Sequence, residues 1–290
     1  MPADDRRRGA TTGRAMDITT VRSYRVARTR EELLLAPGEA ILAGGTWLMS
    51  EPQPTTTGFV DVTAMGWPDI EADDVGLRIS ATCTIATLVA WAKDARDGGT
   101  LPSQQDWPAL SLVPAAADAL LASFKIWNTA TVGGNICRAF AAAGMVSLCV
   151  ALDGTAEIWR GAEVVRLPVA DLVTGDGTTI LQPGDVLRSI HLPAAALRSR
   201  ALLLKIALAE HGRSGAVVTG RVDPSGRSVF TVTAATQTPT VLVFPHLPTA
   251  ADLAARVADA DGYYSDPLGS ADWRRGVSIV LAERIRKGLA

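Results

Sequence analysis

The sequence predicts an α+β protein of two domains, and three observations support this class. From residue 21 to residue 193, runs of β-branched and apolar residues bounded by glycine or proline alternate with helical patterns. After residue 197, four strand patterns follow one another and two helices close the chain, an order typical of α+β domains. The chain has 290 residues, 48% of them hydrophobic, which is enough material for two cores.

The N-terminal part predicts a compact βαβ-like unit. Residues 1–16 carry three consecutive arginines with no apolar segment behind them, which indicates a disordered leader and not a signal peptide. The unit consists of a strand, a short helix opened by Thr29 and a second strand, at Val21–Arg25, Glu31–Ala36 and Ala40–Leu42. Next come two strands, Phe59–Val62 and Leu77–Ala81, and a helix, Ile85–Ala95, with Leu88, Val89 and Ala92 on one face.

The middle of the chain is helical and then returns to strands. Pro114 is expected to separate two short helices within Pro108–Phe124, and small residues predict a helix over Ala139–Leu152. The strand patterns that follow are Ala156–Trp159, Glu163–Leu167 and Val186–Leu192. The Pro-Ala-Ala-Ala stretch at 193–196 is the best domain boundary, and it divides the chain into 17–193 and 197–290.

The C-terminal part predicts an antiparallel meander followed by helices. Asp223–Gly226 is a clear turn between two of its strands. The four strands are Ala201–Ala209, Gly215–Arg221, Val229–Ala235 and Val241–Phe244. The last helix places one apolar stripe toward the core, formed by Trp273, Val277, Val280, Leu281 and Ile285.

Charge and composition exclude several classes of function. The formal net charge of −2 and the pI of about 6.0 offer no basic footprint for nucleic acid. No apolar run approaches the roughly 18 residues of a membrane span, so a cytoplasmic protein is expected. The cysteines and histidines are too scattered to hold a metal or an iron–sulfur cluster, being Cys83, Cys137, Cys149, His191, His211 and His246.

Two glycine pairs carry the functional signal. They are ILAGGTWLMS at Ile41–Ser50 and TATVGGNICRA at Thr129–Ala139. A strand that ends in Gly-Gly lets successive backbone N–H groups converge on an anion without a Cβ in the way, although one such pair alone is more often a turn. Neither pair matches GxxxxGK[ST] or GxGxxG, so the phosphate loop and the Rossmann fingerprint are absent. Two separate cradles suit a diphosphate held between two segments.

The motifs AGGT and TVGGNI, in this order and at this distance, resemble the FAD-binding medium subunit of the molybdenum hydroxylases, the xanthine dehydrogenase and carbon monoxide dehydrogenase type. The segment LQPGDVLRSIHLP at Leu181–Pro193 is similar to the end of that family's flavin domain. The resemblance runs from about Val21 to about Leu289. It implies a PCMH-type FAD-binding fold of two subdomains, followed by a small C-terminal domain with an antiparallel sheet and helices.

The resemblance also implies a set of cofactor-binding residues and no catalytic or metal-ligating residue in this chain. One side of the FAD diphosphate and ribitol would be lined by Leu42, Ala43, Gly44, Gly45, Thr46 and Trp47. The other side would be lined by Ala130, Thr131, Gly133, Gly134 and Asn135, with Arg138 just beyond. Leu121 and Leu187 would lie near the isoalloxazine, unless they are ordinary core leucines. Lys205, in the middle of an apolar strand, is either a buried contact near the cofactor or an edge-strand lysine facing water.

The sequence departs from the family's pattern at two positions. Gly144 stands where the family has an aspartate that binds the flavin, so one hydrogen-bond acceptor, worth about 1 kcal/mol, is missing. Trp47 stands where the family often has a polar residue, and an indole there can stack on a ring or pack in the core. The glycine pairs themselves are intact, and no histidine in them offers a covalent flavin link.

The resemblance implies an electron-transfer subunit. Electrons would arrive from an iron–sulfur small subunit, pass through non-covalently bound FAD, and leave to NAD or another acceptor. The molybdenum cofactor would lie on a large partner subunit of the same hetero-oligomer. Two alternatives are a stand-alone FAD-dependent oxidoreductase with the same fold, and an assembly protein without flavin. The absorption spectrum of the purified chain would separate the flavin-bearing alternatives from the last one.

Overall fold

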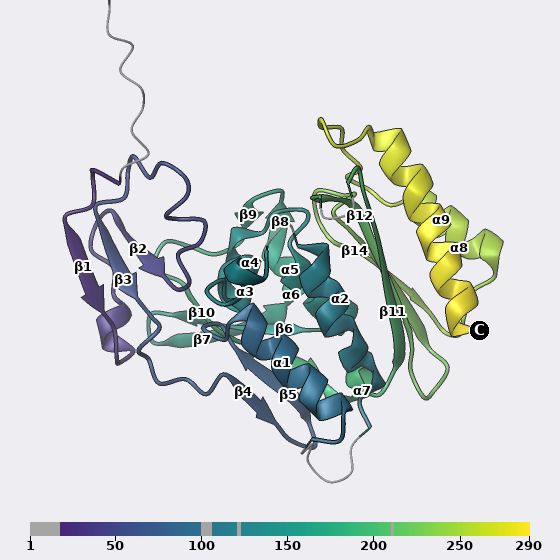
Figure 1. Ribbon diagram of the computed structural model, residues 1–290, viewed down its shortest axis with the longest axis horizontal. Helices are drawn as coiled ribbons and strands as arrows, with labels where there is room; N and C mark the ends of the chain where they lie inside the picture. Colours follow the sequence, from purple (N-terminus) through teal and green to yellow (C-terminus); the bar gives the residue numbers. More distant parts are fainter. Residues whose placement is uncertain (1–17, 100–105, 121–122, 210–211) are drawn as a thin grey trace, which may run out of the picture.

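The computed structural model describes residues 18–99, 106–120, 123–209 and 212–290 (Figure 1). The predicted leader, 1–16, and Leu121 lie outside the described residues. Three sheets of three or more strands follow one another across the molecule. A small N-terminal sheet lies at one end, a five-stranded sheet covered by helices lies in the middle, and a four-stranded sheet with two helices lies at the other end.

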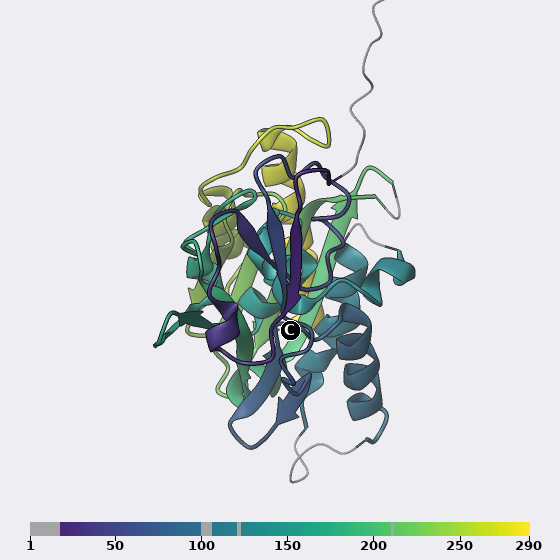
Figure 2. The same ribbon diagram turned by 90° about the vertical axis from the view of Figure 1, so that its left-hand side faces the viewer.

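The N-terminal sheet is parallel and has the order β1-β3-β2. Its strands are β1 Ser23–Val26, β2 Glu39–Leu42 and β3 Gly58–Asp61. The predicted helix Glu31–Ala36 is wrong, because only a 3-10 turn, η1 Glu31–Leu33, forms there. The guanidinium of Arg25 donates hydrogen bonds to the carbonyl oxygens of Glu32 and Leu34. In a longer helix these oxygens would accept from the helix's own N–H groups. Figure 2 shows this sheet in front of the rest of the molecule.

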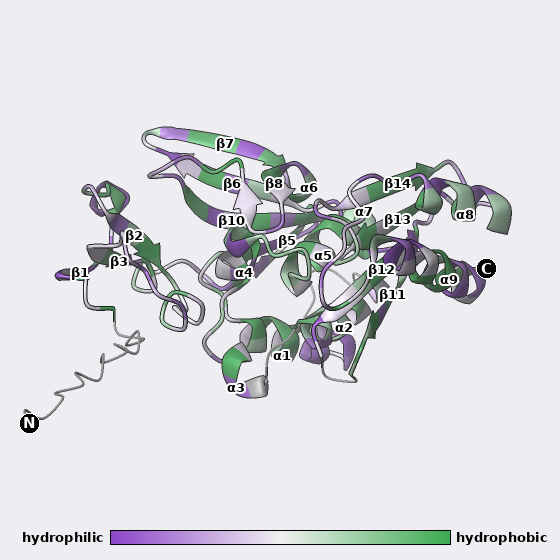
Figure 3. Ribbon diagram, turned by 90° about the horizontal axis from the view of Figure 1, so that it is seen from above, coloured by the Kyte–Doolittle hydropathy of each residue, from purple (hydrophilic) through white to green (hydrophobic). Residues whose placement is uncertain are grey.

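The central sheet is antiparallel and has the order β4-β5-β10-β6-β7. Its strands are β4 Ile70–Ala72, β5 Gly76–Ser80, β6 Thr155–Arg160, β7 Glu163–Pro168 and β10 Val186–Pro193. Strand β7 is an edge strand and carries both hydrophobic and hydrophilic residues (Figure 3). The small elements α6 Val169–Leu172, β8 Val173–Gly175 and β9 Thr178–Thr179 follow β7.

Helices bury one face of the central sheet and form the largest core with it. They are α1 Ile85–Arg96, η3 Pro108–Ser111, α2 Leu112–Ala119, α3 Phe124–Trp127, α4 Val132–Arg138 and α5 Gly144–Ala151. Helix α1 forms as predicted, and Thr84 caps it by accepting from the Thr87 N–H group.

Two helix predictions in this region are wrong. Pro114 does not separate two helices but lies in the first turn of α2, where a missing N–H group costs no hydrogen bond. The helix predicted from Ala139 begins only at Gly144. Ala139 has a φ of 49°, in the left-handed region, and ends α4 there.

The C-terminal domain is the predicted meander with the order β11-β12-β13-β14. Its strands are β11 Arg200–Ala207, β12 Ser214–Val222, β13 Ser228–Thr233 and β14 Thr240–Phe244. Helices α8 Ala250–Ala258 and α9 Ala271–Leu289 cover its outer face (Figure 1). The predicted stripe on α9 is wrong at Val280, which is 50% exposed. The fully buried Arg274 faces the sheet in place of Val280, because its guanidinium donates to the Gly215 and Ala234 carbonyl oxygens.

The inner face of this sheet packs on α2 and α5 through buried polar contacts. The hydroxyls of Ser147 and Thr233 lie 2.6 Å apart, and Ser214 Oγ donates to the Ala119 carbonyl oxygen at 2.8 Å. The chain passes between the two parts through α7 Ala194–Leu197, which is buried against β5 and β10. The domain limits 17–193 and 197–290 stay a prediction.

Candidate functional site

The first glycine segment turns directly out of β2. Gly45 has a φ of +66°, which favours glycine, and its carbonyl accepts from the Met49 N–H group at 2.9 Å. One helical turn therefore follows the glycine pair. Among the described residues, the backbone N–H groups of positions 44–48 have no hydrogen-bond acceptor. This turn presents unused donors, which is the geometry that binds an anion.

The second glycine segment uses its N–H groups differently. Val132 donates to the Cys83 carbonyl oxygen at 2.9 Å, and Gly133 donates to that of Ala81 at 3.0 Å. Gly134 donates to Oγ1 of Thr131, which caps α4. The expectation that both segments point free amides at an anion is therefore wrong for the second one.

Gly133 is needed for close packing rather than for an open cradle. A Cβ at Gly133 would lie 2.7 Å from the Cα of Ala81, so only glycine lets α4 pack this closely on the end of β5. The α4 turn is thereby fixed to the central sheet by the same N–H groups that the sequence pattern assigned to a ligand.

The two segments nevertheless meet, although they are far apart in the sequence. A Cβ on Gly44 would collide with the carbonyl oxygen of Thr129, and it would lie 2.9 Å from the Thr129 carbonyl carbon and 3.2 Å from Ala130 Cα. Gly44 thus lies directly against the residues that lead into α4. The structure brings the free amide turn of the first segment beside the second segment.

Several predicted residues have clear local roles. Leu42 is buried, and Ala43 packs against the core of the N-terminal sheet. Asn135 Oδ1 accepts from the Met145 N–H group at 2.9 Å and so caps the start of α5. Ala130 and Thr131 are buried where Thr131 bridges to Thr84. These contacts position the second segment.

Leu187 and Lys205 have neighbours outside the glycine segments. Leu187 is 5% exposed and packs in the large core on β10. Lys205 lies on the edge strand β11, half-buried, and its ammonium donates to the carbonyl oxygen of Asp118 near the end of α2. Lys205 is therefore an edge-strand lysine, but it bonds to protein and not only to water. Its assignment and that of Leu187 as cofactor contacts stay predictions.

Arg138 joins the two glycine segments through its side chain. Its guanidinium carbon lies 4.0 Å from the ring centroid of Trp47 and 4.0 Å from that of Phe140. Its Nε is buried without a hydrogen-bond partner, and its Nη1 donates to the Gly177 carbonyl oxygen at 3.4 Å. Burial lowers the pKa of this guanidinium, and the nearby carboxylates Asp176 and Glu51 oppose that effect.

Phe140 was not predicted as part of the site. It is 36% exposed, and it follows Arg138 by two residues just after α4 ends. The sequence did offer one signal for this residue, because an aromatic side chain stands next to a glycine motif and an arginine. The sequence did not reveal that Ala139 is left-handed. This conformation turns the chain so that Phe140 faces back toward Arg138.

Gly144 has a structural reason of its own. A Cβ there would collide with the carbonyl oxygen of Ala116 and lie 3.2 Å from its carbon, because α5 starts directly against α2. The aspartate that the resemblance expects at this position therefore has no room in this packing of the two helices.

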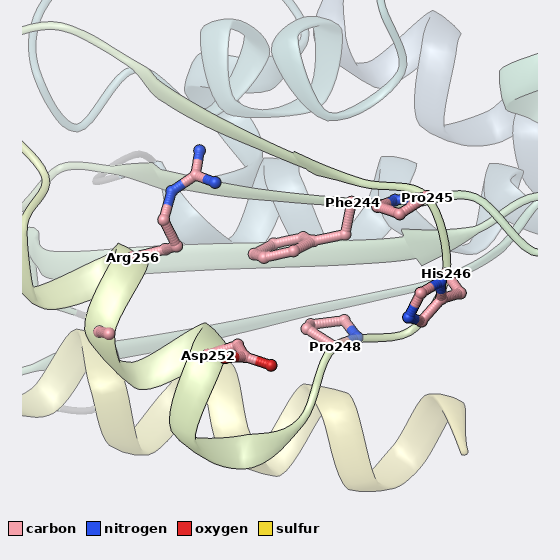
Figure 4. Close-up of a pocket in the computed structure, with 7 residues that line it drawn as sticks. Phe244, Pro245, His246, Pro248, Asp252 and Arg256 are labelled. Carbon is pink, nitrogen blue, oxygen red and sulfur yellow. The ribbon is translucent and has the colours of Figure 1, made fainter.

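A separate groove lies on the C-terminal domain (Figure 4). It has a volume of about 400 Å³ between the end of β14 and α8, and Arg256 extends over the Phe244 ring at 5.5 Å. Its lining consists of Phe244, Pro245, His246, Pro248, Asp252, Ala255 and Arg256.

Within the described parts of the chain, no group of three or more His, Cys, Asp or Glu side chains could hold a metal ion. No helix there is long and apolar enough to span a bilayer.

Comparison with known proteins identifies the family of this chain and several similar proteins. Residues 19–195 match the family described as the FAD binding domain in molybdopterin dehydrogenase. The chain is 31% identical over 122 residues to the xanthine dehydrogenase FAD-binding subunit of Escherichia coli O157:H7. That alignment covers 42% of this chain and 37% of the relative, so the chain spans well under half of the relative's length. A putative xanthine dehydrogenase FAD-binding subunit of E. coli strain K12 matches to the same extent.

Solved structures share the fold over almost the whole chain. Carbon monoxide dehydrogenase from Oligotropha carboxidovorans superposes with a TM-score of 0.78 at 19% identity, covering 92% of this chain and 98% of that one. Quinoline 2-oxidoreductase from Pseudomonas putida 86 gives a TM-score of 0.75 at 19% identity, covering 92% and 96%. The likeness confirms the predicted α+β class with its C-terminal domain.

Proposed function

Because the chain belongs to the family of FAD-binding domains of molybdopterin dehydrogenases, we propose that it is the electron-transfer subunit of a xanthine dehydrogenase-like complex. The observation that carries the proposal is the contact of Gly44 with Thr129 and Ala130, which sets an unused amide turn against the second glycine segment. Such a turn suits the diphosphate of FAD.

The residues present fit FAD. The N–H groups of Gly44, Gly45, Thr46 and Trp47 would hold a phosphate, because they have no acceptor in the described protein. The buried, unpartnered Nε of Arg138 is a further donor beside them. Leu42, Ala43, Ala130, Thr131, Gly133, Gly134 and Asn135 would form the walls of the site, with Leu187 and Lys205 as proposed contacts further along the cofactor.

The chain's own work is to bind and orient the cofactor. FAD, when bound, supplies redox chemistry that couples one-electron and two-electron carriers. The free amide turn of the first glycine segment would hold the diphosphate, and the packing of α4 on the end of β5 fixes the second segment beside that turn. No acid, base or nucleophile from this chain is required for that task.

We assign the remaining parts of the complex to partner subunits. An iron–sulfur small subunit would deliver electrons, a molybdopterin large subunit would hold the hydroxylated substrate, and NAD or another acceptor would take the electrons. The E. coli relatives, named as xanthine dehydrogenase subunits, support the xanthine-type assignment. The cytoplasm is the proposed compartment, and the free thiols of Cys83, Cys137 and Cys149 support it.

The test of cofactor binding uses the purified chain and a matched pair of glycine variants. The wild type is expected to carry FAD, visible as flavin absorption and released on denaturation. Gly44→Ala pushes the first segment off Thr129 and is expected to lose the flavin. Gly276→Ala, in the exposed middle of α9 with nothing within 4 Å of the added Cβ, should keep it. A colourless wild type that takes up no FAD would refute the proposal.

A second experiment tests the complex. The tagged chain, isolated from its native host, is expected to bring down one small and one large protein together with iron and molybdenum. Isolation of the chain alone, with full turnover of a substrate, would instead favour a stand-alone flavoenzyme.

A further inference from the structure

The guanidinium of Arg138 packs against two rings from different parts of the chain. Trp47 belongs to the first glycine segment, and Phe140 follows α4, with each ring centroid 4.0 Å from the guanidinium carbon. The two rings position the group, but a ring accepts none of the in-plane N–H donors of a guanidinium that lies over its face. The guanidinium is therefore positioned, while its hydrogen bonds are left open.

The donors of this guanidinium are poorly satisfied by the protein. Nε is buried with no partner, and within the described chain its one hydrogen bond is the 3.4 Å contact from Nη1 to the Gly177 carbonyl oxygen. A buried unpaired donor is costly unless something else accepts from it.

The neighbouring carboxylates do not take these donors. Asp176 accepts from the Ala141 N–H group at 2.8 Å, and its other oxygen lies 3.7 Å from Arg213. Glu51 acts on Arg138 only through its charge. The arrangement thus lacks an anionic acceptor in the plane of the guanidinium.

We propose that Arg138, clamped between Trp47 and Phe140, is the ionic anchor of the FAD diphosphate, in the place of the amides that the second glycine segment has already used. The inference rests on the proposed function and deepens it. The stack on Trp47 puts the guanidinium beside the free amide turn of residues 44–48. Backbone dipoles from one segment and a full positive charge from the other then face the same anion.

The experiment is calorimetric titration of the purified apo-chain with FAD over a range of salt concentrations. Arg138→Met is expected to weaken FAD binding about tenfold or more and to flatten its salt dependence, because one charge-assisted contact is lost. Arg138→Lys should keep the salt dependence and lose part of the affinity, since an ammonium cannot stack as a flat group. Trp47→Leu should also weaken binding, because it frees the guanidinium.

The controls separate charge from folding. Arg256→Met removes a cation that lies over Phe244 and should leave FAD affinity unchanged, because Arg256 belongs to α8, at the opposite end of the molecule from the N-terminal sheet (Figure 1). Arg138→Gln removes the charge but keeps an N–H donor, and its salt dependence should be as flat as that of the methionine variant, which keeps the test open if Arg138→Met does not fold.

Three outcomes would overturn the inference. They are unchanged FAD affinity in Arg138→Met and Arg138→Gln, weaker binding with an unaltered salt dependence, and tighter binding. The last would mean that the guanidinium obstructs the cofactor. If the wild type itself binds no FAD, the proposed function fails, whereas a wild type that binds FAD as well as its Arg138 variants refutes only this inference.

Discussion

At the scale of single residues, the thiols are chemically quiet. Burial raises the pKa of Cys83, Cys137 and Cys149 to about 12 from 9.0. Only the thiolate reacts quickly, and these thiols stay protonated at neutral pH. Their reactivity is therefore expected to report unfolding.

We expect a thiol reagent at pH 8 to label the native chain slowly and the urea-unfolded chain at all three cysteines. The raised pKa also has a thermodynamic sign. Because the unfolded thiols ionise first, their contribution to stability is complete below about pH 9 and is lost between about pH 9 and 12. Fast labelling of all three cysteines in the native chain would contradict their burial. It would be seen with an aromatic disulfide reagent, which releases one coloured thiolate for each cysteine that it labels.

At the scale of elements, the start of α5 is the tightest helix contact in the site region. Gly144→Ala forces a methyl group onto the Ala116 carbonyl, so we expect a loss of about 1–3 kcal/mol in the free energy of unfolding. The control Gly276→Ala should raise it by about 0.5–1 kcal/mol, because alanine is the better helix former where space is open. Urea denaturation measures both, and equal stabilities would show that α2 and α5 are not in this close contact.

Local sequence patterns predicted the features that depend on a single helix, strand or motif. They did not predict the features that depend on contacts between two elements. The strands of the C-terminal meander and helix α1 follow from local patterns, and so do the two glycine pairs. Whether the N–H groups of Val132 and Gly133 are free depends on Cys83 and Ala81, which no pattern near the motif reveals. The exposure of Val280 likewise depends on carbonyl oxygens that hold Arg274 from β12 and the end of β13.

At the scale of the whole molecule, a buried guanidinium joins the C-terminal sheet to the end of α5. Arg221 on β12 is 2% exposed, donates to the Ala151 carbonyl oxygen at 2.8 Å and pairs with Asp153. Arg227 approaches the carboxylate of Asp153 only at 3.8 Å, and the side chains of Arg227 and Asp153 are both partly exposed. The chain thus offers two arginines that share one partner at different depths.

Arg221→Met is expected to lower the free energy of unfolding by about 1–3 kcal/mol, because it leaves a buried carbonyl unsatisfied. Arg227→Met should change it by less than about 0.5 kcal/mol. We further expect the single urea transition of the wild type to broaden or split in Arg221→Met, as the C-terminal sheet separates from α5. Identical transitions in both variants would mean that this contact does not couple the two parts.

The contact between Gly44 and Thr129 also determines when the site forms during folding. It is a contact of high sequence separation, so the chain must close a long loop before the site exists, and such contacts are slow to form. During synthesis, no ribosome-bound fragment that stops short of Thr129 can hold the cofactor. Flavin uptake therefore follows the docking of the N-terminal sheet, and a pulse of labelled FAD would mark only chains in which that sheet has already docked.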